Sequence, residues 1–463
     1  MNHYESSFSR AASLGPQPPV ASIKFLEYLR ATRANVLSGY PRAAYEEWLV
    51  RMRYLGRDHF IVNEPTAIKR VLLENSSNYA KGEMERRLTL GGMRRSSVET
   101  FDETWRTRRQ TMSSLFDYRR LPQYSPIITE ECSKLLREWV KHPEGVAIDL
   151  IAAMRKLTSQ VIARILIGSE YDNFLEVMHP VLEQRAAEPA IDLLDYLSPF
   201  NQARRAYRRF RDRRAFKPVT RGVDLFIKGI QENSESREQP QVGSLVSLLA
   251  EDRENSFTVE ELRSFVITTF AAAHETTAMA LVWTMYVLSQ HPMHEARLHE
   301  ELSRVLQGRV PSLPDLENLL YTRMVFEESL RLYPPFHMLA WREVLDQDTL
   351  CGQTIPKGGT VYIVPWLLHR HVRLWDDPTR FNPDRFLPER ASLRPRMSFL
   401  PFGTGPRVCV GASFAMTEAI LILATLLQSF RLRLRRGHCV EPIGRLILTP
   451  RFGMPMMLEA RLP

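Results

Sequence analysis

The feature that most constrains the fold is a largely apolar segment, Thr258 to His291, that contains neither glycine nor proline. Thr258 is followed three residues later by Glu261, which is the pattern of a helix-capping box, and Pro292 marks the end of the segment. At about 1.5 Å per residue, such a helix is a rod of roughly 50 Å. A rod so long and so apolar has to run through the middle of one large domain, which argues against several separate domains.

Helical periodicity dominates the rest of the chain, and the strand-like patterns are short. The sequence therefore predicts a mainly α protein with small β-sheets, in which a flexible segment over 1–20 precedes a single domain over 21–463. Helices are expected, among others, over 40–54, 121–141, 148–168, 259–290 and 412–428. Strands are expected at 54–63, at 349–365 with a turn at Gly358-Gly359, and within 431–462.

Composition excludes several classes of protein. The 463 residues are 44% hydrophobic and 25% charged, which excludes a disordered or coiled-coil chain. The net charge of +9 favours acidic partners but is too diffuse to indicate nucleic acid. Four cysteines cannot form a disulfide framework in so long a chain, which indicates a reducing compartment. The polar N-terminus resembles neither a signal peptide nor a membrane anchor, so a cytoplasmic protein is expected.

The clearest candidate for chemistry is a glycine-rich segment with one cysteine, which spans 402–411 and reads Phe-Gly-Thr-Gly-Pro-Arg-Val-Cys-Val-Gly. Cys409 stands just before a helix expected to begin near Ala412, whose free N–H groups and positive dipole end favour a thiolate. The glycines allow close approach to something flat and bulky. Arg407 is placed to pair with an anionic group. A structural cysteine in a tight turn is the alternative interpretation.

This segment resembles the haem-binding loop of the cytochrome P450 family, Phe-x-x-Gly-x-Arg-x-Cys-x-Gly. Phe402, Gly405, Arg407, Cys409 and Gly411 all match it in register. The resemblance implies the cytochrome P450 fold and haem b (iron protoporphyrin IX) as cofactor. It also implies that Cys409 is the thiolate ligand of the iron, that Arg407 contacts a haem propionate, and that Phe402 and Gly411 belong to the cofactor loop.

Two further segments resemble motifs that support this loop in the family. Glu328 and Arg331 match Glu-x-x-Arg, and Phe381 to Phe386, which includes Arg385, is similar to Phe-x-Pro-x-Arg-Phe. By resemblance, Glu328, Arg331 and Arg385 form a buried charge network with a structural role. Removing one partner would leave a buried charge uncompensated.

Other candidates for haem contacts lie on two separate segments. Trp105 and Arg109 match the family's Trp-x-x-x-Arg helix motif, and residues four apart share one helix face. The alternative for this pair is an ordinary surface helix rich in arginine. Arg342, before the second strand region, is a further propionate partner by resemblance.

The middle of the long helix reads Ala272-Ala273-His274-Glu275-Thr276-Thr277 and resembles the family's oxygen-activation motif. The resemblance implies that Glu275 and Thr276 relay the protons that the oxygen chemistry consumes. Ala273 stands where the family commonly has glycine, which narrows the space above the iron. An ordinary helix with a chance polar patch is the alternative.

The substrate pocket is expected, by resemblance, to be apolar and roomy. It is expected to draw on parts of 81–100, 190–215, 265–276 and 336–340, with a rim of arginines in the first of these ranges. The residues expected to line it are Phe265, Phe270, Ala272, Ala273, Phe336, Met338 and Leu339.

Two rival sites are weaker. A zinc site of the His-Glu-x-x-His type needs histidines four residues apart, whereas His294 and His299 are five apart and point about 140° away from each other on a helix. The arginine-rich run over 204–217 is better explained by a solvated helix face than by a nucleic-acid or membrane surface. By resemblance it lies in the family's mobile lid, where arginines would attract a carboxylate.

The sequence therefore predicts a monomeric haem-thiolate monooxygenase that does not bind nucleic acid. Its substrate is expected to be small and apolar, with or without a carboxylate, such as a fatty acid, a terpenoid or a steroid. Electrons must come from a separate ferredoxin with its reductase or from a flavodoxin, since the chain has no Rossmann fingerprint or iron–sulfur cysteine cluster. The alternatives are a haem-thiolate peroxygenase or dehydratase, and a non-catalytic basic binding protein that would leave the cysteine motif unexplained.

Overall fold

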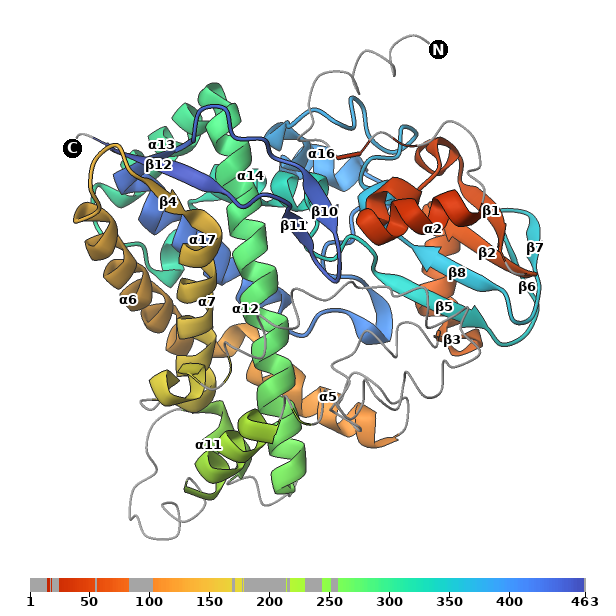
Figure 1. Cartoon of the computed structure of the whole chain (residues 1–463), viewed down its shortest axis with the longest axis horizontal. Coiled ribbons are helices and arrows are strands. Elements are labelled where there is room, and N and C mark those ends of the chain that lie inside the picture. The colour runs from red at the N-terminus through yellow and green to blue at the C-terminus, as the bar shows by residue number, and fades with distance from the viewer. Residues whose placement is uncertain are drawn as a thin grey trace.

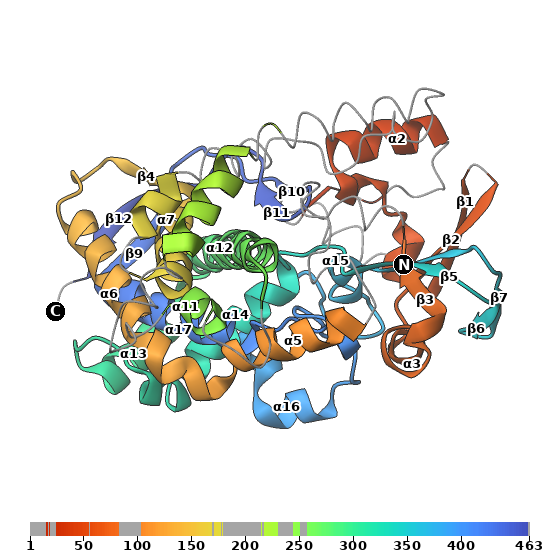
Figure 2. The same cartoon turned by 90° about the horizontal axis from the view of Figure 1, so that it is seen from below.

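Helices packed around one long central helix form most of the molecule. The computed structural model describes residues 15–16, 18, 25–54, 56–82, 103–168, 171–176, 178, 214, 217–229, 244–250 and 257–461. In Figure 1 the central helix, α12 (Val259–Gln290), runs through the middle of the molecule, and Figure 2 views it nearly end-on with other helices around it. The other α-helices in the described part of the chain are α2 (Phe25–Ala34), α3 (Pro65–Lys69), α5 (Glu103–Leu115), α6 (Leu121–Val140), α7 (Leu150–Ile167), α11 (Leu245–Ala250), α13 (Pro292–Leu306), α14 (Leu320–Leu332), α15 (Pro365–Leu368), α16 (Pro388–Leu393) and α17 (Ala412–Ser429).

The central helix forms where the sequence predicts it. The backbone N–H of Glu261 donates to Thr258 Oγ1 (3.3 Å), and the N–H of Thr258 donates to Glu261 Oε2 (2.9 Å), so the capping box is present. Between its ends α12 packs against α7, α14 and α17, and most of its second half is buried. This packing explains why a helix so apolar is stable in the middle of the protein.

Among the described residues, α12 and α17 are long and apolar enough to cross a membrane by length and composition alone. In each helix, however, 67% of the apolar window is buried inside the protein. The packing that surrounds them accounts for their hydrophobicity, since core helices satisfy the same criterion.

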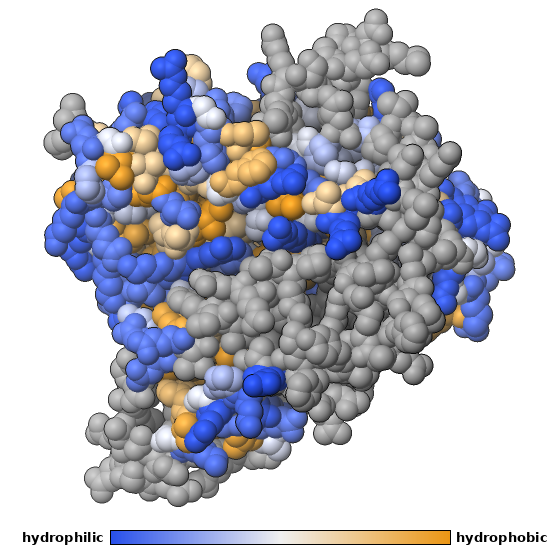
Figure 3. All heavy atoms as spheres, viewed as in Figure 1, coloured by the Kyte–Doolittle hydropathy of each residue, from blue (hydrophilic) through white to orange (hydrophobic). Residues whose placement is uncertain are grey.

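The largest sheet lies at one end of the molecule, at the right in Figure 1. Its strand order is β1-β2-β8-β5-β3, and β2 and β8 pair in parallel. In Figure 3 the described part of this end is mostly hydrophilic, whereas hydrophobic atoms gather over the helical part. The strands are β1 (Leu49–Tyr54), β2 (Arg57–Val62), β3 (Tyr79–Lys81), β5 (Ala340–Val344) and β8 (Thr360–Ile363).

The smaller sheets have two or three strands each. β4 (Ala147–Asp149), β12 (Pro455–Ala460) and β9 (Phe430–Leu434) form a three-stranded sheet in that order. β10 (Pro442–Gly444) pairs with β11 (Leu448–Pro450), and β6 (Asp348–Leu350) pairs with β7 (Gln353–Ile355). These pairs explain the short strand-like patterns in the last third of the sequence.

One sequence prediction is wrong at the first hairpin. The helix expected over 40–54 is replaced by the 3₁₀ turn η3 (Arg42–Tyr45) and by β1, which pairs antiparallel with β2 from Leu49↔Val62 to Tyr54↔Arg57. The reversal occurs at Gly56, whose φ of +76° suits glycine. Pairing with β2 therefore outweighs the helical periodicity of this segment.

Two groups of buried side chains form the core. The larger one joins α6, α7, α12, α13, α14 and α17 and contains residues such as Trp283, Leu281 and Leu421. The smaller one lies under the five-stranded sheet and includes Phe60, Val71 and Leu72. Leu400, two residues before the glycine-rich segment, is buried in the smaller core, while Phe402 packs against the larger one. The glycine-rich segment thus begins where the two cores meet.

Candidate functional site

The glycine-rich segment forms a tight loop that ends at the start of α17. The N–H of Cys409 donates to the carbonyl of Phe402 (2.9 Å), and the N–H of Val408 donates to the carbonyl of Gly405 (3.0 Å). Gly411 is the N-cap residue of α17. These two backbone bonds hold Cys409 at the N-terminal end of the helix, as the sequence predicts.

Cys409 is exposed as a residue, but protein surrounds its thiol group. Burial raises the pKa of this thiol, while the backbone N–H of Gly411 and the guanidinium of Arg109 lower it. Burial is the largest of these effects, so the pKa is raised and the thiol holds its proton more firmly than an ordinary cysteine does. The two lowering contacts favour the thiolate, which is the form that binds iron, but they offset burial only in part. Metal binding at this sulfur would therefore release a proton.

The loop approaches its neighbours closely at two glycines with positive φ. Gly403 (φ +72°) lies against Leu339, whose Cδ1 would be 3.0 Å from an added Cβ. Gly405 (φ +76°) lies against the carbonyl oxygen of Leu72, which an added Cβ would overlap. Both positions thus require glycine for conformation and for space.

The arginines expected at the haem edge are in different surroundings. Arg109 on α5 donates from Nη2 to the carbonyl of Val408, so the structure brings it to the cysteine loop. Arg407 is part-buried within the loop, in the 3₁₀ turn η9 (Gly405–Arg407). Arg342 is buried on β5 and donates from Nη1 to the Trp341 carbonyl (3.4 Å). Trp105 lies one turn before Arg109 on α5, and its side chain is outside the described part of the structure.

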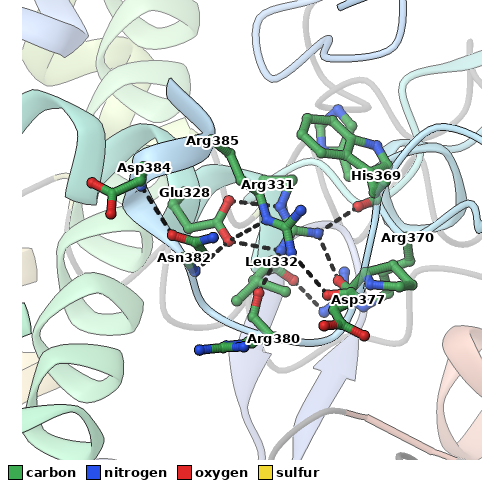
Figure 4. Close-up of polar contacts among 12 residues, drawn as sticks. Glu328, Arg331, Leu332, His369, Arg370, Asp377, Arg380, Asn382, Asp384 and Arg385 are labelled. Atoms are coloured by element: carbon green, nitrogen blue, oxygen red, sulfur yellow. Dashed lines mark hydrogen bonds and ion pairs between the residues drawn. The ribbon is translucent and has the colours of Figure 1, made fainter. Parts of the chain in front are cut away.

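The structure brings Glu328, Arg331 and Arg385 together as a buried network (Figure 4). Arg331 Nε and Nη2 donate to the two carboxylate oxygens of Glu328 at 2.7 and 2.8 Å, and Arg385 Nε lies 3.4 Å from Glu328 Oε1. The side chains of Glu328 and Arg331 are completely buried. The backbone N–H of Asn382 also donates to Glu328 (2.8 Å). The network thus joins α14 to the segment around the 3₁₀ turn η8 (Pro383–Phe386).

This network continues toward the cysteine loop through His369. Arg331 Nη1 donates to the carbonyl of His369 (2.8 Å), and the N–H of Leu400 donates to His369 Nε2 (2.9 Å). Burial holds the pKa of His369 far below its ordinary value, so its ring is neutral and can accept this bond. Leu400 lies two residues before the loop, so the network positions the chain that enters it.

In the middle of α12, Glu275 and Thr276 are both partly exposed. Arg155 on α7 binds both carboxylate oxygens of Glu275, from Nε at 2.8 Å and from Nη2 at 2.5 Å. The hydroxyl of Thr276 donates to the carbonyl of Ala272 (2.7 Å). The sequence gives no signal for Arg155, because it lies 120 residues from its partner and its neighbours read as an ordinary amphipathic helix.

The expected pocket residues fall into two groups. Ala272 is exposed and Ala273 is partly exposed, although both lie mid-helix on α12. Phe270 is fully buried, and its ring centroid lies 5.0 Å from that of Phe174. Phe265, also on α12, is buried as well. On the segment before β5, Phe336 is exposed, and Met338 and Leu339 are partly buried. Most of the expected contributions from 81–100 and 190–215, and most of the run over 204–217, lie outside the described residues.

The chemistry of these residues fits a haem-thiolate group. A soft sulfur donor stands at a helix N-terminus, beside a backbone N–H and a guanidinium that would stabilise it as a thiolate once a metal displaces its proton. Gly403 and Gly405 leave no room for side chains where they pack against Leu339 and Leu72. Ala272 offers a methyl group, and Thr276 a hydroxyl, on the exposed side of the central helix.

Comparisons with known proteins agree with this arrangement. The family described as Cytochrome P450 matches residues 17–454. Cyclooctatin synthase of Streptomyces melanosporofaciens is 33% identical over 349 residues, which cover 74% of both chains. Pentalenene oxygenase of Streptomyces avermitilis is 32% identical over 371 residues, which cover 77% of this chain and 78% of the relative.

A crystal structure of the cytochrome P450DA heme domain has the same fold. It superimposes with a TM-score of 0.79 at 23% identity and covers 96% of this chain and 98% of its own. The predicted mainly helical fold with small sheets is therefore confirmed. The chain belongs to the cytochrome P450 family of haem-thiolate monooxygenases.

Proposed function

We propose that this protein is a cytoplasmic, monomeric monooxygenase that inserts one atom of dioxygen into a cyclic terpenoid. The observation that carries the proposal is the position of Cys409, an exposed residue held at the start of α17 beside the N–H of Gly411 and the guanidinium of Arg109. This arrangement supports a thiolate ligand to haem iron.

The proposed cofactor is haem b, with Cys409 as the iron ligand. Phe402 and Gly411 frame the loop around this ligand, and Arg109, Arg407, Arg342 and Trp105 are proposed to hold the propionates. When bound, the haem supplies activation of dioxygen, so that one oxygen atom enters the substrate and the other leaves as water, at the cost of two protons and two electrons. The arginines supply charge-assisted hydrogen bonds to the carboxylates.

Glu275 and Thr276 are proposed to deliver these protons. The carboxylate of Glu275 is part-exposed and is held at both oxygens by Arg155, so its position on α12 is fixed. The hydroxyl proton of Thr276 is engaged with its own helix, which leaves the oxygen lone pairs to accept a proton. To deliver a proton, the carboxylate of Glu275 has to leave Arg155, take up a proton from solvent and turn toward Thr276.

The proposed substrate class rests on the exposed face of α12 and on the relatives. Thr268, Ala272 and Thr276 are spaced by four residues and are all accessible, so the helix presents a low, continuous surface to a bulky ring system. The bacterial relatives include the cyclooctatin synthase and pentalenene oxygenase described above and a cyclooctat-9-en-7-ol 5-monooxygenase. A cyclic terpenoid therefore has more support than a fatty acid or a steroid.

The proposed electron donor is a small acidic protein, a ferredoxin with its reductase or a flavodoxin. The net charge of +9 supports an acidic donor, because complementary charge speeds encounter between redox proteins. Salt should then slow the electron transfer. A peroxygenase is the second candidate, and it would oxidise the same substrate with hydrogen peroxide and no electron donor.

The first experiment is the absorption spectrum of the reduced protein with carbon monoxide, for the wild type and for Cys409→Ser. We expect a far red-shifted Soret band in the wild type and its loss in the variant, because only a thiolate ligand produces that shift. Cys439→Ser, which alters another exposed free cysteine, is the matched control and should keep the band. A band at the histidine-ligated position in the wild type would contradict the assignment of Cys409.

A further inference from the structure

A single carboxylate ties both ends of a π-helical turn that precedes β3. The turn is η4 (Arg70–Glu74), and the carboxylate is that of Asp348, the first residue of β6. Arg70, the first residue of the turn, donates from Nε to both oxygens (3.0 Å each) and from Nη2 to Oδ1 (2.7 Å). Asn75, the residue that ends the turn, donates from Nδ2 to Oδ2 (3.0 Å). Loss of this carboxylate would release the turn at both ends.

Asp348 also accepts hydrogen bonds from β3 and from the next residue of its own strand, β6. The hydroxyl of Tyr79 donates to Oδ2 (2.7 Å), and the backbone N–H of Thr349 donates to Oδ1 (2.8 Å). Only 5% of the Asp348 side chain is exposed. Burial opposes ionisation, yet the bonds from Arg70 and Tyr79 hold the pKa of Asp348 well below its ordinary value. The carboxylate is therefore charged whenever the protein is folded near neutral pH.

The turn that Asp348 holds lies directly against the cysteine loop. An added Cβ on Gly405 would overlap the carbonyl oxygen of Leu72 and would lie 3.4 Å from Leu73 Cδ2. Leu72 is the middle residue of the turn, and Leu73 follows it. The same Gly405 accepts the backbone bond from Val408, the residue before Cys409. A shift of the turn would thus reach the cysteine through backbone contacts.

From this geometry we infer that Asp348 is a positioning residue for Cys409, acting through the π-helical turn. π-Helical turns occur frequently at functional sites, because they cost stability and persist where they place a group. The turn closes the loop from the side of the five-stranded sheet, while the His369 contact holds the chain that enters it. The inference rests on the proposed function in so far as Cys409 is the iron ligand.

The test compares Asp348→Asn with the wild type by two measurements on the purified holoprotein. The first is amide hydrogen exchange in a peptide that covers 402–411, where we expect about tenfold faster exchange in the variant. The second is the Soret band with carbon monoxide, where we expect part of the population to move to the ordinary position. Tyr79→Phe removes one bond only and should give a smaller change in both, which keeps the test available should Asp348→Asn fold poorly.

Asp315→Asn is the matched control. Asp315 is also mostly buried and is bound by an arginine, Arg309, and by Ser312, but it lies in the 3₁₀ turn η7 (Leu313–Glu317), near the far end of α17. If hydrogen exchange over 402–411 rose equally in this control, the inference would be overturned, since a general loss of stability would explain the result in both variants. Unchanged loop exchange in Asp348→Asn and Tyr79→Phe would also overturn it. The wild type could lack the red-shifted band while hydrogen exchange in the loop rises only in the Asp348 and Tyr79 variants. That result would support the positioning role and contradict the proposed function.

Discussion

At the scale of single residues, Glu418 makes stability depend on pH. It lies on α17 and is 1% exposed, and its Oε1 has no hydrogen-bond partner among the residues that the structure describes. Burial raises the pKa of this carboxyl from 4.5 to about 8, although a hydrogen bond from Thr277 opposes the change. Between these two values the folded protein binds a proton that the unfolded chain releases. Stability should therefore fall as the pH rises from about 5 to about 8.

Glu418→Gln removes this titration. We expect the variant to gain stability relative to the wild type, on the order of 3 kcal/mol, as the pH rises through this window. Urea unfolding at several pH values measures the difference. Glu389→Gln, which changes an exposed acid on α16, is the control and should leave the slope of stability against pH unchanged. A Glu418→Gln variant with the wild-type slope would contradict the prediction.

Single residues of the site differ in whether the sequence predicts their role. Cys409 and its flanking glycines are predictable, because the loop and the start of α17 are encoded within ten neighbouring residues. Arg155 and Asp348 are not, because each acts on a partner more than a hundred residues away. Nothing in the local pattern distinguishes these two from other charged residues at the surface of a helix or in a turn.

At the scale of elements, the contact of α14 with η8 depends on a buried ion pair. Glu328→Gln would leave Arg331 charged and completely buried without its carboxylate, which we expect to cost about 3–5 kcal/mol of unfolding free energy. Glu301→Gln is the matched control. Glu301 is also buried and contacts α14, but its partners are the N–H groups of Tyr321 and Thr322 and the hydroxyl of Thr322, so no arginine loses its counter-charge.

The pair of variants separates charge from packing. Chemical denaturation should show a larger loss for Glu328→Gln than for Glu301→Gln, and the double variant Glu328→Gln with Arg331→Met should recover part of that loss. Equal losses in the two single variants would mean that the uncompensated charge is not the cause.

Elements differ in how well sequence predicts them. The ends of α12 are predictable, since Thr258, Glu261 and Pro292 mark them locally. β1 is not predictable, because its conformation is fixed by pairing with β2 and not by its own periodicity. Local signals therefore predict the ends of capped helices, whereas a strand depends on a pairing partner that cannot be identified from its own residues.

At the scale of the whole molecule, the arrangement of the sheet depends on distant pairing. β2 and β8 lie about 300 residues apart and pair in parallel from His59↔Thr360 to Ile61↔Tyr362. The smaller core under this sheet contains Phe60, Val361 and Leu72, so it is built from both ends of the chain. No pattern within either end predicts this pairing, although the family resemblance implies the fold as a whole.

The two cores predict how the molecule responds to removal of haem. The proposed cofactor would cover Ala272 and Thr276 on α12 and bind Cys409, all of which are accessible in the protein alone. A group that binds only the folded state adds about 4 kcal/mol to the free energy of unfolding when its concentration is roughly a thousand times its Kd.

The haem-free protein should therefore melt at a lower temperature, and hydrogen exchange should rise mainly in α12 and the loop over 402–411. Peptides from β2 and β8 should change little, because the smaller core is complete without the cofactor. Calorimetry and exchange before and after haem is added back measure both effects, and equal loosening of β2 and β8 would show that the two cores unfold as one.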